Sequence, residues 1–362
     1  GSVPRLYVIR SDYPEPRPVG DSATHLLSVS STGELAVLVR ATFIQHRVFV
    51  GTLARMPMGG GAPRELLADV RDADWAPSGS DLAIIHRVAG KDRLEYPIGK
   101  VLYQSSGYLS DLRFSRAGDR IAFFEHPSQW DDRGGLAIVD LNGQARTLTD
   151  GYWGLEGLAW TLDGKRLVYG AAVEGGFYQT HSVTLAGETH LILPSAGTVT
   201  VQDMSAAGRL LVTRDDQFQR LMVKAPGAQV ERDLSWLDQS SSSRISHDGQ
   251  LVAFGDESAD AGSNYATMIR KSDGSPATRL GEGGVRDVST DKQWVVSIVP
   301  STPPKLVLYP TGPGQSRVIP NGGLQSYADV KFFPDGKSLM ICGNEPAHAA
   351  RCYVRPADGG PA

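Results

Sequence analysis

Two pairs of adjacent aspartates are the clearest grouping of metal-ligating side chains in this 362-residue sequence. Asp131 with Asp132, and Asp215 with Asp216, each fall in a predicted loop between two strands. Carboxylate pairs on loops can bind Ca²⁺, which prefers oxygen ligands. Neither pair has the alternating spacing of a calcium-binding loop, and the eight histidines are scattered without ligand spacing. We therefore interpret the aspartates as solvated loop charges and expect no metal site.

The sequence motifs of common enzymes are absent. The chain has no Gly-x-Ser-x-Gly nucleophile elbow, no His-Glu-x-x-His zinc motif and no protein-kinase motif. Gly336 to Ser338 resembles the end of a phosphate-binding loop, but Lys331 stands where that loop requires glycine. We expect no catalytic residues, no cofactor and no enzymatic activity in this chain.

Four aromatic residues stand in or beside loops at predicted strand ends: Tyr108, Trp130, Trp153 and Tyr327. Aromatic side chains supply much of the contact area in binding sites, and Asp131 adds a nearby carboxylate. These five residues are our candidate ligand- or partner-binding residues. The competing interpretation is that the aromatic side chains pack between neighbouring sheets.

A repeated phrase defines the elements that must position these residues. Its pattern is Ser-x-Asp-Gly followed by a short apolar run, and successive copies are 39 to 46 residues apart. An apolar residue always stands four positions before the glycine, and a small or apolar residue four positions after it. Such self-similarity indicates a repeat architecture. The eight anchor positions are Gly33, Gly79, Gly118, Gly164, Gly208, Gly249, Lys292 and Gly336.

Each phrase predicts a turn between two antiparallel strands. Aspartate can accept hydrogen bonds from nearby backbone amides, and glycine tolerates positive φ. Lys292 departs from the pattern, so it must accept left-handed geometry or form another turn. A weaker third strand follows, then a fourth strand with an Arg-x-Leu-like phrase, as in residues 136–141 and 146–148. Four strands in about 40 residues are the size of a propeller blade.

We therefore expect an all-β fold, a β-propeller of four-stranded antiparallel blades in one domain covering residues 1–362. Eight blades are expected, with seven as the alternative. The last repeat has no fourth strand of its own, and we predict that residues 5–19 close it. The predicted blades are roughly 21–68, 69–107, 108–150, 151–197, 198–236, 237–282, 283–323 and 324–362.

Composition excludes several function classes. Hydrophobic residues make up 41% and charged residues 21% of the chain, which is too apolar for a disordered protein. The net charge of −4 and the lack of any Lys/Arg block predict no nucleic-acid partner and no membrane contact by this chain. Cys342 and Cys352 fall on neighbouring strands of one hairpin, so a cross-strand disulfide and two free thiols are both open.

The repeats resemble the WD40-like, or PD40, repeats of TolB-type propellers. More specifically, the chain resembles the C-terminal propeller region of bacterial, acidobacterial-type serine/threonine protein kinases. That resemblance implies a cytoplasmic kinase domain and a membrane segment elsewhere in the parent protein, with the propeller as an extracytoplasmic sensory part. The opening Gly1-Ser2 is typical of a cloning remnant, so we expect a piece of a longer protein. The segments that carry the kinase-linked resemblance are 51–57, 60–66, 93–103, 233–238, 270–277 and 342–346.

The leading hypothesis is a non-catalytic sensor or binding module of a bacterial receptor-type kinase. An unknown small ligand or protein would bind at the mouth of the propeller channel, where the most variable loops gather. The alternatives are a TolB-like periplasmic scaffold for protein interactions and the accessory propeller of a prolyl-peptidase-like hydrolase.

Overall fold

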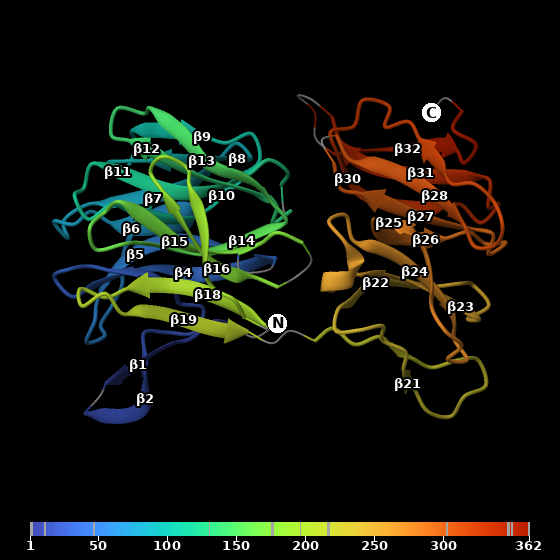
Figure 1. Ribbon diagram of the computed structural model, residues 1–362, viewed down its shortest axis with the longest axis horizontal. Helices are drawn as coiled ribbons and strands as arrows, with labels where there is room; N and C mark the ends of the chain where they lie inside the picture. Colours follow the sequence, from blue (N-terminus) through green and yellow to red (C-terminus); the bar gives the residue numbers. More distant parts are fainter. Residues whose placement is uncertain are drawn as a thin grey trace. The chain divides into compact units, whose positions relative to one another are not determined.

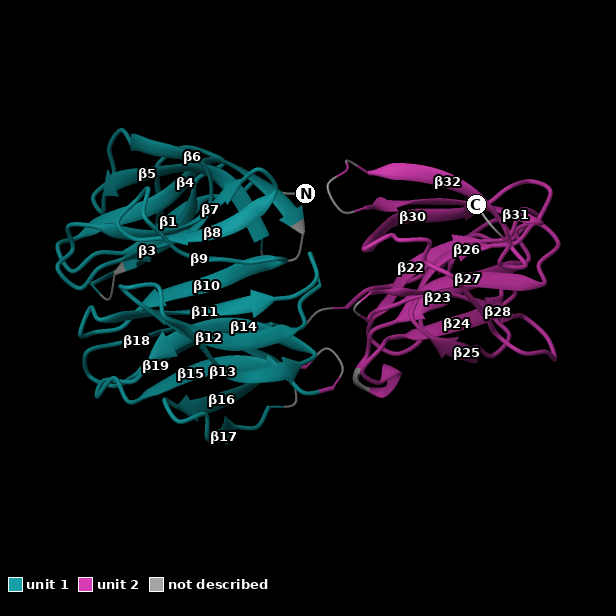
Figure 2. Cartoon of the chain, turned by 90° about the horizontal axis from the view of Figure 1, so that it is seen from above, with its two compact units in different colours: residues 1–173, 178–215 teal, residues 174–177, 216–362 magenta. Residues whose placement is uncertain are grey.

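The computed structural model describes residues 3–10, 12–45, 48–129, 131–174, 177–195, 197–215, 218–301, 303–345, 348 and 350–360. Strands dominate these residues (Figure 1), as expected for an all-β fold. Within them no helix has the length and apolar character needed to cross a bilayer. The chain divides into two compact units, unit 1 with residues 1–173 and 178–215, and unit 2 with residues 174–177 and 216–362 (Figure 2).

Unit 1 consists of antiparallel sheets in which each strand pairs with the next along the chain. Strands β10–β13 and β14–β17 form two four-stranded sheets, and β18 pairs with β19. Strands β3–β9 form one seven-stranded sheet, because the long β6 serves both as an outer strand and as the first strand of the next repeat. The bounds are β3 (His25–Val29), β4 (Glu34–Gln45), β5 (Val48–Pro57), β6 (Arg64–Trp75), β7 (Leu82–Val88), β8 (Lys91–Glu95), β9 (Val101–Gln104), β10 (Tyr108–Phe114), β11 (Arg120–His126), β12 (Gly134–Asp140), β13 (Ala145–Tyr152), β14 (Gly154–Trp160), β15 (Arg166–Ala172), β16 (Gln179–Thr184), β17 (Thr189–Leu193), β18 (Thr198–Met204) and β19 (Leu210–Asp215).

Unit 2 repeats the same strand order. Strands β22–β25 and β26–β29 form four-stranded sheets, β30–β32 a three-stranded sheet, and β20 pairs with β21. A single turn of 3-10 helix, η1 (Ala259–Ala261), precedes β24. The bounds are β20 (Met222–Val223), β21 (Arg232–Asp233), β22 (Ser240–Ile245), β23 (Leu251–Asp256), β24 (Ala266–Lys271), β25 (Thr278–Glu282), β26 (Gly284–Val288), β27 (Trp294–Val299), β28 (Lys305–Pro310), β29 (Arg317–Ile319), β30 (Ser326–Phe332), β31 (Ser338–Asn344) and β32 (Arg351–Pro356).

The repeated phrase forms the predicted turn at all eight positions. Each anchor lies between the first and second strands of its repeat and has a positive φ, from 61° at Lys292 to 83° at Gly33. The anchor amide donates to the carbonyl three residues earlier in every copy. Aspartates accept amide hydrogen bonds as expected, for example Asp335 from Lys337 at 2.8 Å. Lys292 therefore accepts left-handed geometry, and its ammonium pairs with Asp248 of the preceding turn.

The apolar core lies between neighbouring sheets. Adjacent residues of a strand face opposite sides, so Phe123 and Phe124 of β11 enter two different clusters. Phe123 packs with Ile85 of the preceding repeat, and Phe124 packs with Tyr169 of the following one. Second strands such as β11 are thus buried on both faces and hold successive sheets together.

The N-terminal segment forms a hairpin of its own. β1 (Leu6–Arg10) and β2 (Tyr13–Val19) pair with each other in a separate sheet. The closure of the last repeat by residues 5–19 stays a prediction. Val8 and Val19 of this hairpin pack with Met56 of the first sheet. Local pairing costs little loop-closure entropy, and the three prolines of β2 remove amide donors from one of its edges.

The two cysteines form a disulfide. Cys342 of β31 and Cys352 of β32 are directly opposite in the antiparallel register, with Cα atoms 4.0 Å apart. Of the two alternatives left open by the sequence, the structure contains the cross-strand disulfide.

Replacing Gly164 by alanine is expected to lower the free energy of unfolding by about 1 kcal/mol. Gly164 has a φ of 64° and open space where a Cβ would lie, so the cost is that of left-handed backbone alone. Urea unfolding followed by circular dichroism measures it. Gly59→Ala is the matched control, because Gly59 also has open space but no positive φ. Equal stability of the two variants would contradict the turn assignment.

Removing the disulfide with the double substitution Cys342→Ser and Cys352→Ser is expected to cost about 2–3 kcal/mol of stability. The chain-entropy model gives that value for a loop of this length, and the cysteines are 10 residues apart. Thermal unfolding with and without a reductant measures the effect. The reductant should destabilise the natural sequence and leave the double variant unchanged; the opposite pattern would rule out the bond.

Candidate functional site

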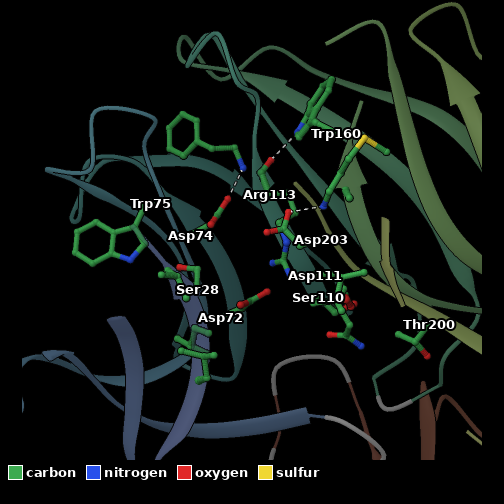
Figure 3. Close-up of a pocket in the computed structure, with 18 of the residues that line it drawn as sticks. Ser28, Asp72, Asp74, Trp75, Ser110, Asp111, Arg113, Trp160, Thr200 and Asp203 are labelled. Atoms are coloured by element: carbon green, nitrogen blue, oxygen red, sulfur yellow. Dashed lines mark hydrogen bonds between the residues drawn. The ribbon is translucent and has the colours of Figure 1, made fainter. Parts of the chain in front are cut away.

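A cavity of about 1240 Å³ lies within unit 1 (Figure 3). It is lined mainly by residues of the first strands of the repeats, β3, β6, β10, β14 and β18. These five strands are neighbours in chain order. Such an arrangement, with first strands around a common space, is the blade organisation of a propeller.

A β-bulge in each of these strands shapes the cavity wall. The pairing register shifts at the equivalent place in all five, for example between Ser110 and Arg113 of β10. Asp111, inside that bulge, has a φ of 52°. Bulges re-aim side chains, and here they bring polar groups to the cavity. The lining includes Asp72, Asp74, Asp111, Arg113 and Asp203.

The bulges also explain how successive sheets are joined. The amide of Leu112 donates to Oδ2 of Asp72 at 2.9 Å, and the amide of Gly157 donates to Oδ1 of Asp111 at 2.9 Å. Oδ2 of Asp74 accepts from the amide of Phe114 at 2.8 Å (Figure 3). An aspartate of one first strand therefore satisfies a backbone donor of the next.

Arg113 is the cation at the centre of these carboxylates. Burial lowers its pKa, but the charges of Asp74, Asp72, Asp111 and Asp203 outweigh burial and raise the pKa overall. The guanidinium Nη1 donates to the backbone oxygen of Leu112 at 2.7 Å. The single positive charge of Arg113 thus interacts favourably with four aspartates.

The aspartates themselves are harder to ionise than usual. Burial raises the pKa of Asp72 to about 7, with Arg113 opposing and Asp111 adding to the shift. Burial also raises the pKa of Asp74 and of Asp111. Asp72 and Asp74 are half-buried, and both line the cavity.

Ser110 and His126 form a hydrogen-bonded pair in the cavity wall. Oγ of Ser110 lies 2.9 Å from Nε2 of His126. Nδ1 of His126 lies 3.1 Å from the carbonyl oxygens of Asp132 and Arg133. Carbonyl oxygens only accept, so the ring proton is on Nδ1 and the serine hydroxyl donates to Nε2. Burial raises the pKa of the neighbouring Asp111, and the Ser110 hydroxyl opposes that shift.

Two of the five candidate residues, Tyr108 and Asp131, are brought together. Tyr108 lines the cavity but is only 1% exposed. Its hydroxyl donates to the backbone oxygen of Asp131 at 3.1 Å, and its ring stacks on His126 at 4.1 Å. The Asp131 carboxylate accepts from the amide of Arg133 at 3.1 Å. Tyr108 therefore acts as a packed support of the cavity wall.

The other three candidates do not gather at this cavity. Trp153 is buried and absent from the cavity lining. Tyr327 belongs to unit 2, where it packs with a cluster that includes Val330 and Ile341. Trp130 lies outside the described residues. A binding role for these aromatic residues stays a prediction.

The sequence contained a signal for the charged lining of the cavity, but the candidate residues were chosen for their aromatic side chains instead. The position five residues before each anchor alternates between acidic and basic types in most copies. The same device recurs in unit 2, where Oδ2 of Asp287 accepts from the amide of Phe332 at 2.9 Å. The eight residues at this position are Ser28, Asp74, Arg113, Ala159, Asp203, Arg244, Asp287 and Lys331.

Comparison with known proteins returns distant structural similarity. No protein-family model and no curated protein matches the chain. Among solved structures, a putative TolB from Agrobacterium tumefaciens is 14% identical over 72% of this chain and 82% of its own, with a TM-score of 0.31. The propeller domain of the Trilobed protease from Pyrococcus furiosus is 8% identical over 91% of this chain and 95% of its own, with a TM-score of 0.33. A puromycin-hydrolyzing peptidase from Mycobacterium tuberculosis is 14% identical over 84% of this chain and 53% of its own, with a TM-score of 0.41. Similarity of this extent does not assign the chain to a family.

Replacing Asp72 by asparagine is expected to flatten the pH dependence of stability between about pH 4 and pH 7. The folded-state pKa is raised to about 7 from an ordinary 3.8, so between these values the folded state holds a proton that the unfolded chain has lost. Stability from this group is therefore highest in acid and falls as the pH rises from about 4 through about 7. Urea unfolding at several pH values measures the slope.

Asparagine keeps an acceptor for the Leu112 amide, so Asp72→Asn is expected to fold. Asp163→Asn is the control, because Asp163 is exposed and its hydrogen bond from Thr161 lowers its pKa, which puts its titration below this window. A slope unchanged by Asp72→Asn would contradict the burial of an ionisable group at this position.

Proposed function

We propose that this chain is a non-catalytic binding module whose ligand occupies the unit 1 cavity. The observation that carries the proposal is the lining, where Asp72, Arg113 and Asp203 reach the cavity from three different sheets. Ligand-binding cavities typically hold a few convergent polar groups that fix the orientation of the ligand. A cavity of about 1240 Å³ is large enough to hold a small molecule.

The Ser110–His126 pair is the feature that most resembles catalytic machinery, and its surroundings oppose that role. A serine nucleophile produces an oxyanion, which needs hydrogen-bond donors or positive charge beside it. The residue next to Ser110 in the cavity wall is instead a carboxylate, Asp111. Nδ1 of His126 faces neutral carbonyl oxygens, whereas a catalytic triad places a carboxylate there. Negative charge at this point favours the binding of a cation and opposes the oxyanion that acyl transfer would form.

The parent protein and its location form the second part of the proposal. The sequence resemblance favours the sensory part of a bacterial receptor-type serine/threonine kinase. The Cys342–Cys352 disulfide supports an extracytoplasmic location, since structural disulfides persist in oxidising compartments. The gene sequence upstream of residue 3 tests this part directly: a kinase domain followed by a membrane helix is expected, and a secretion signal alone would contradict it.

Binding is tested by thermal unfolding of the purified chain against a small-molecule library that contains cationic, neutral and anionic compounds. A ligand present at 100 times its Kd stabilises a protein by about 2.7 kcal/mol, so binders raise the melting temperature. We expect at least one binder whose effect is lost in Asp203→Asn and kept in Asp163→Asn. A library without any binder, or binders indifferent to Asp203, would contradict the proposed site.

The absence of catalysis has a separate test. The purified chain should remain unlabelled at Ser110 by a fluorophosphonate probe. Labelling that is abolished by His126→Ala would contradict the non-catalytic assignment.

A further inference from the structure

Strands β4 and β5 continue beyond the rest of their sheet and form a two-stranded tip. Within residues 42–45 and 48–50 the two strands pair with each other. β3 pairs with β4 only as far as Leu38, and β6 pairs with β5 only as far as Gly51. Among the described residues, this tip therefore pairs with no third strand.

A β-bulge at the base of the tip changes the direction of β4. The register shifts between Val39 and Thr42, and Arg40 within the shift has a φ of 52°. On the opposite strand, a Cβ at Gly51 would lie 2.9 Å from the carbonyl oxygen of Val39. Bulges bend a strand and re-aim its side chains, so these residues build a bend between the sheet and the tip.

Hydrogen bonds to two neighbouring segments fix this bend. The amide of Ala41 donates to the carbonyl oxygen of Ala23 at 2.9 Å. The Arg40 guanidinium donates two hydrogen bonds to the Glu65 carboxylate, at 2.7 and 2.8 Å. Such two-point pairs add geometric specificity to their energy. The direction of the tip is thus set by the folded structure around it.

The tip brings an aromatic ring to the unit 1 cavity. Phe49 lines the cavity and is half-buried. Its ring stacks on His25, another lining residue, with ring centroids 4.3 Å apart. Phe43, directly opposite in the register of the tip, packs edge-on against Phe49 at 5.6 Å and is 55% exposed. Burial lowers the pKa of His25, so its imidazole is uncharged near neutral pH and stacks as a neutral ring.

Exposure distinguishes this stack from the other aromatic residues of the cavity. Tyr108 and Trp160 are buried, whereas Phe49 keeps part of its surface open and Phe43 keeps more than half. Leu26, which lines the same cavity, is also exposed. Adjacent exposed apolar side chains mark interaction sites, and aromatic rings stack favourably on other rings. A ring supplied by a ligand would cover this surface.

From the fixed bend and the exposed stack together, we propose that the tip of β4 and β5 is an aromatic recognition site, and that the unit 1 cavity binds a small aromatic compound. The ring of the ligand packs against Phe49 and Phe43, and its polar substituents face the charged lining. This inference rests on the proposed function, because it names the ligand class of the same cavity.

Isothermal titration calorimetry of the whole chain tests the proposal with two pairs of probes that differ only in the ring. The pairs are 2-phenylethylamine with 2-cyclohexylethylamine, and phenylacetate with cyclohexylacetate. An amine and a carboxylate are both used because the proposal concerns the ring. Aromatic pairing adds about twofold to tenfold in affinity beyond the burial of area. We expect the aromatic member of at least one pair to bind more tightly than its saturated counterpart by that factor.

Phe43→Leu is the first variant, because it removes an exposed ring, keeps an apolar side chain and leaves the core intact. It should reduce the preference for the aromatic probe, and Phe49→Leu should reduce it further. Tyr7→Leu is the matched control, since Tyr7 is an exposed aromatic residue of β1 outside the cavity lining. This control should keep the full preference.

Equal binding of aromatic and saturated probes, or a preference that survives in both Phe43→Leu and Phe49→Leu, would overturn this inference. If none of the four probes binds while a library compound binds in an Asp203-dependent way, the inference fails and the proposed binding function stands. If the library also contains no binder, both fail.

Discussion

Backbone amides at the bulges of the first strands need acceptors that their own sheets do not provide. In β10 and β14 the amides of Leu112 and Gly157 stand inside the register shift. Asp72 and Asp111, each from the preceding first strand, accept these two amides. Neighbouring sheets are thus joined at their innermost strands by charge-assisted hydrogen bonds, which are stronger than neutral ones. The cavity, its lining and its charge all follow from this way of satisfying the backbone.

Close approach of the innermost strands adds a second constraint. Gly157 has a φ of 73°, and a Cβ at this position would lie 2.0 Å from the carbonyl oxygen of Val201 in the next first strand. Glycine is therefore required both by the left-handed backbone and by the contact. Carboxylates crowded in this way raise one another's pKa, and Arg113 offsets part of that cost. The same aspartates therefore join neighbouring sheets and give the cavity its negative charge.

The candidate aromatic residues illustrate why a binding site is harder to predict than a turn. Tyr108 stands at a strand end, as the sequence suggested, but its ring stacks on His126 and its hydroxyl is held by the following loop. Solvent exposure of a side chain at a strand end depends on what the adjacent loop covers, and that is a tertiary property. The position five residues before the anchor is charged in six of the eight copies, yet charges at such a position are ordinarily assigned to solvent.

The sequence alone determined the all-β class, the repeat and its eight turns, because each turn depends on hydrogen bonds between residues at most five apart and on one left-handed residue. For Lys292 the sequence left two alternatives open, and the structure has the left-handed one, with a φ of 61°. Tertiary structure alone decided that β1 and β2 pair with each other, that Cys342 and Cys352 are bonded, and that Arg113 lies among four aspartates. The contacts around Arg113 join residues that the sequence separates widely, such as Asp72 and Leu112, 40 positions apart. Their proximity depends on how whole sheets pack, which no local pattern encodes.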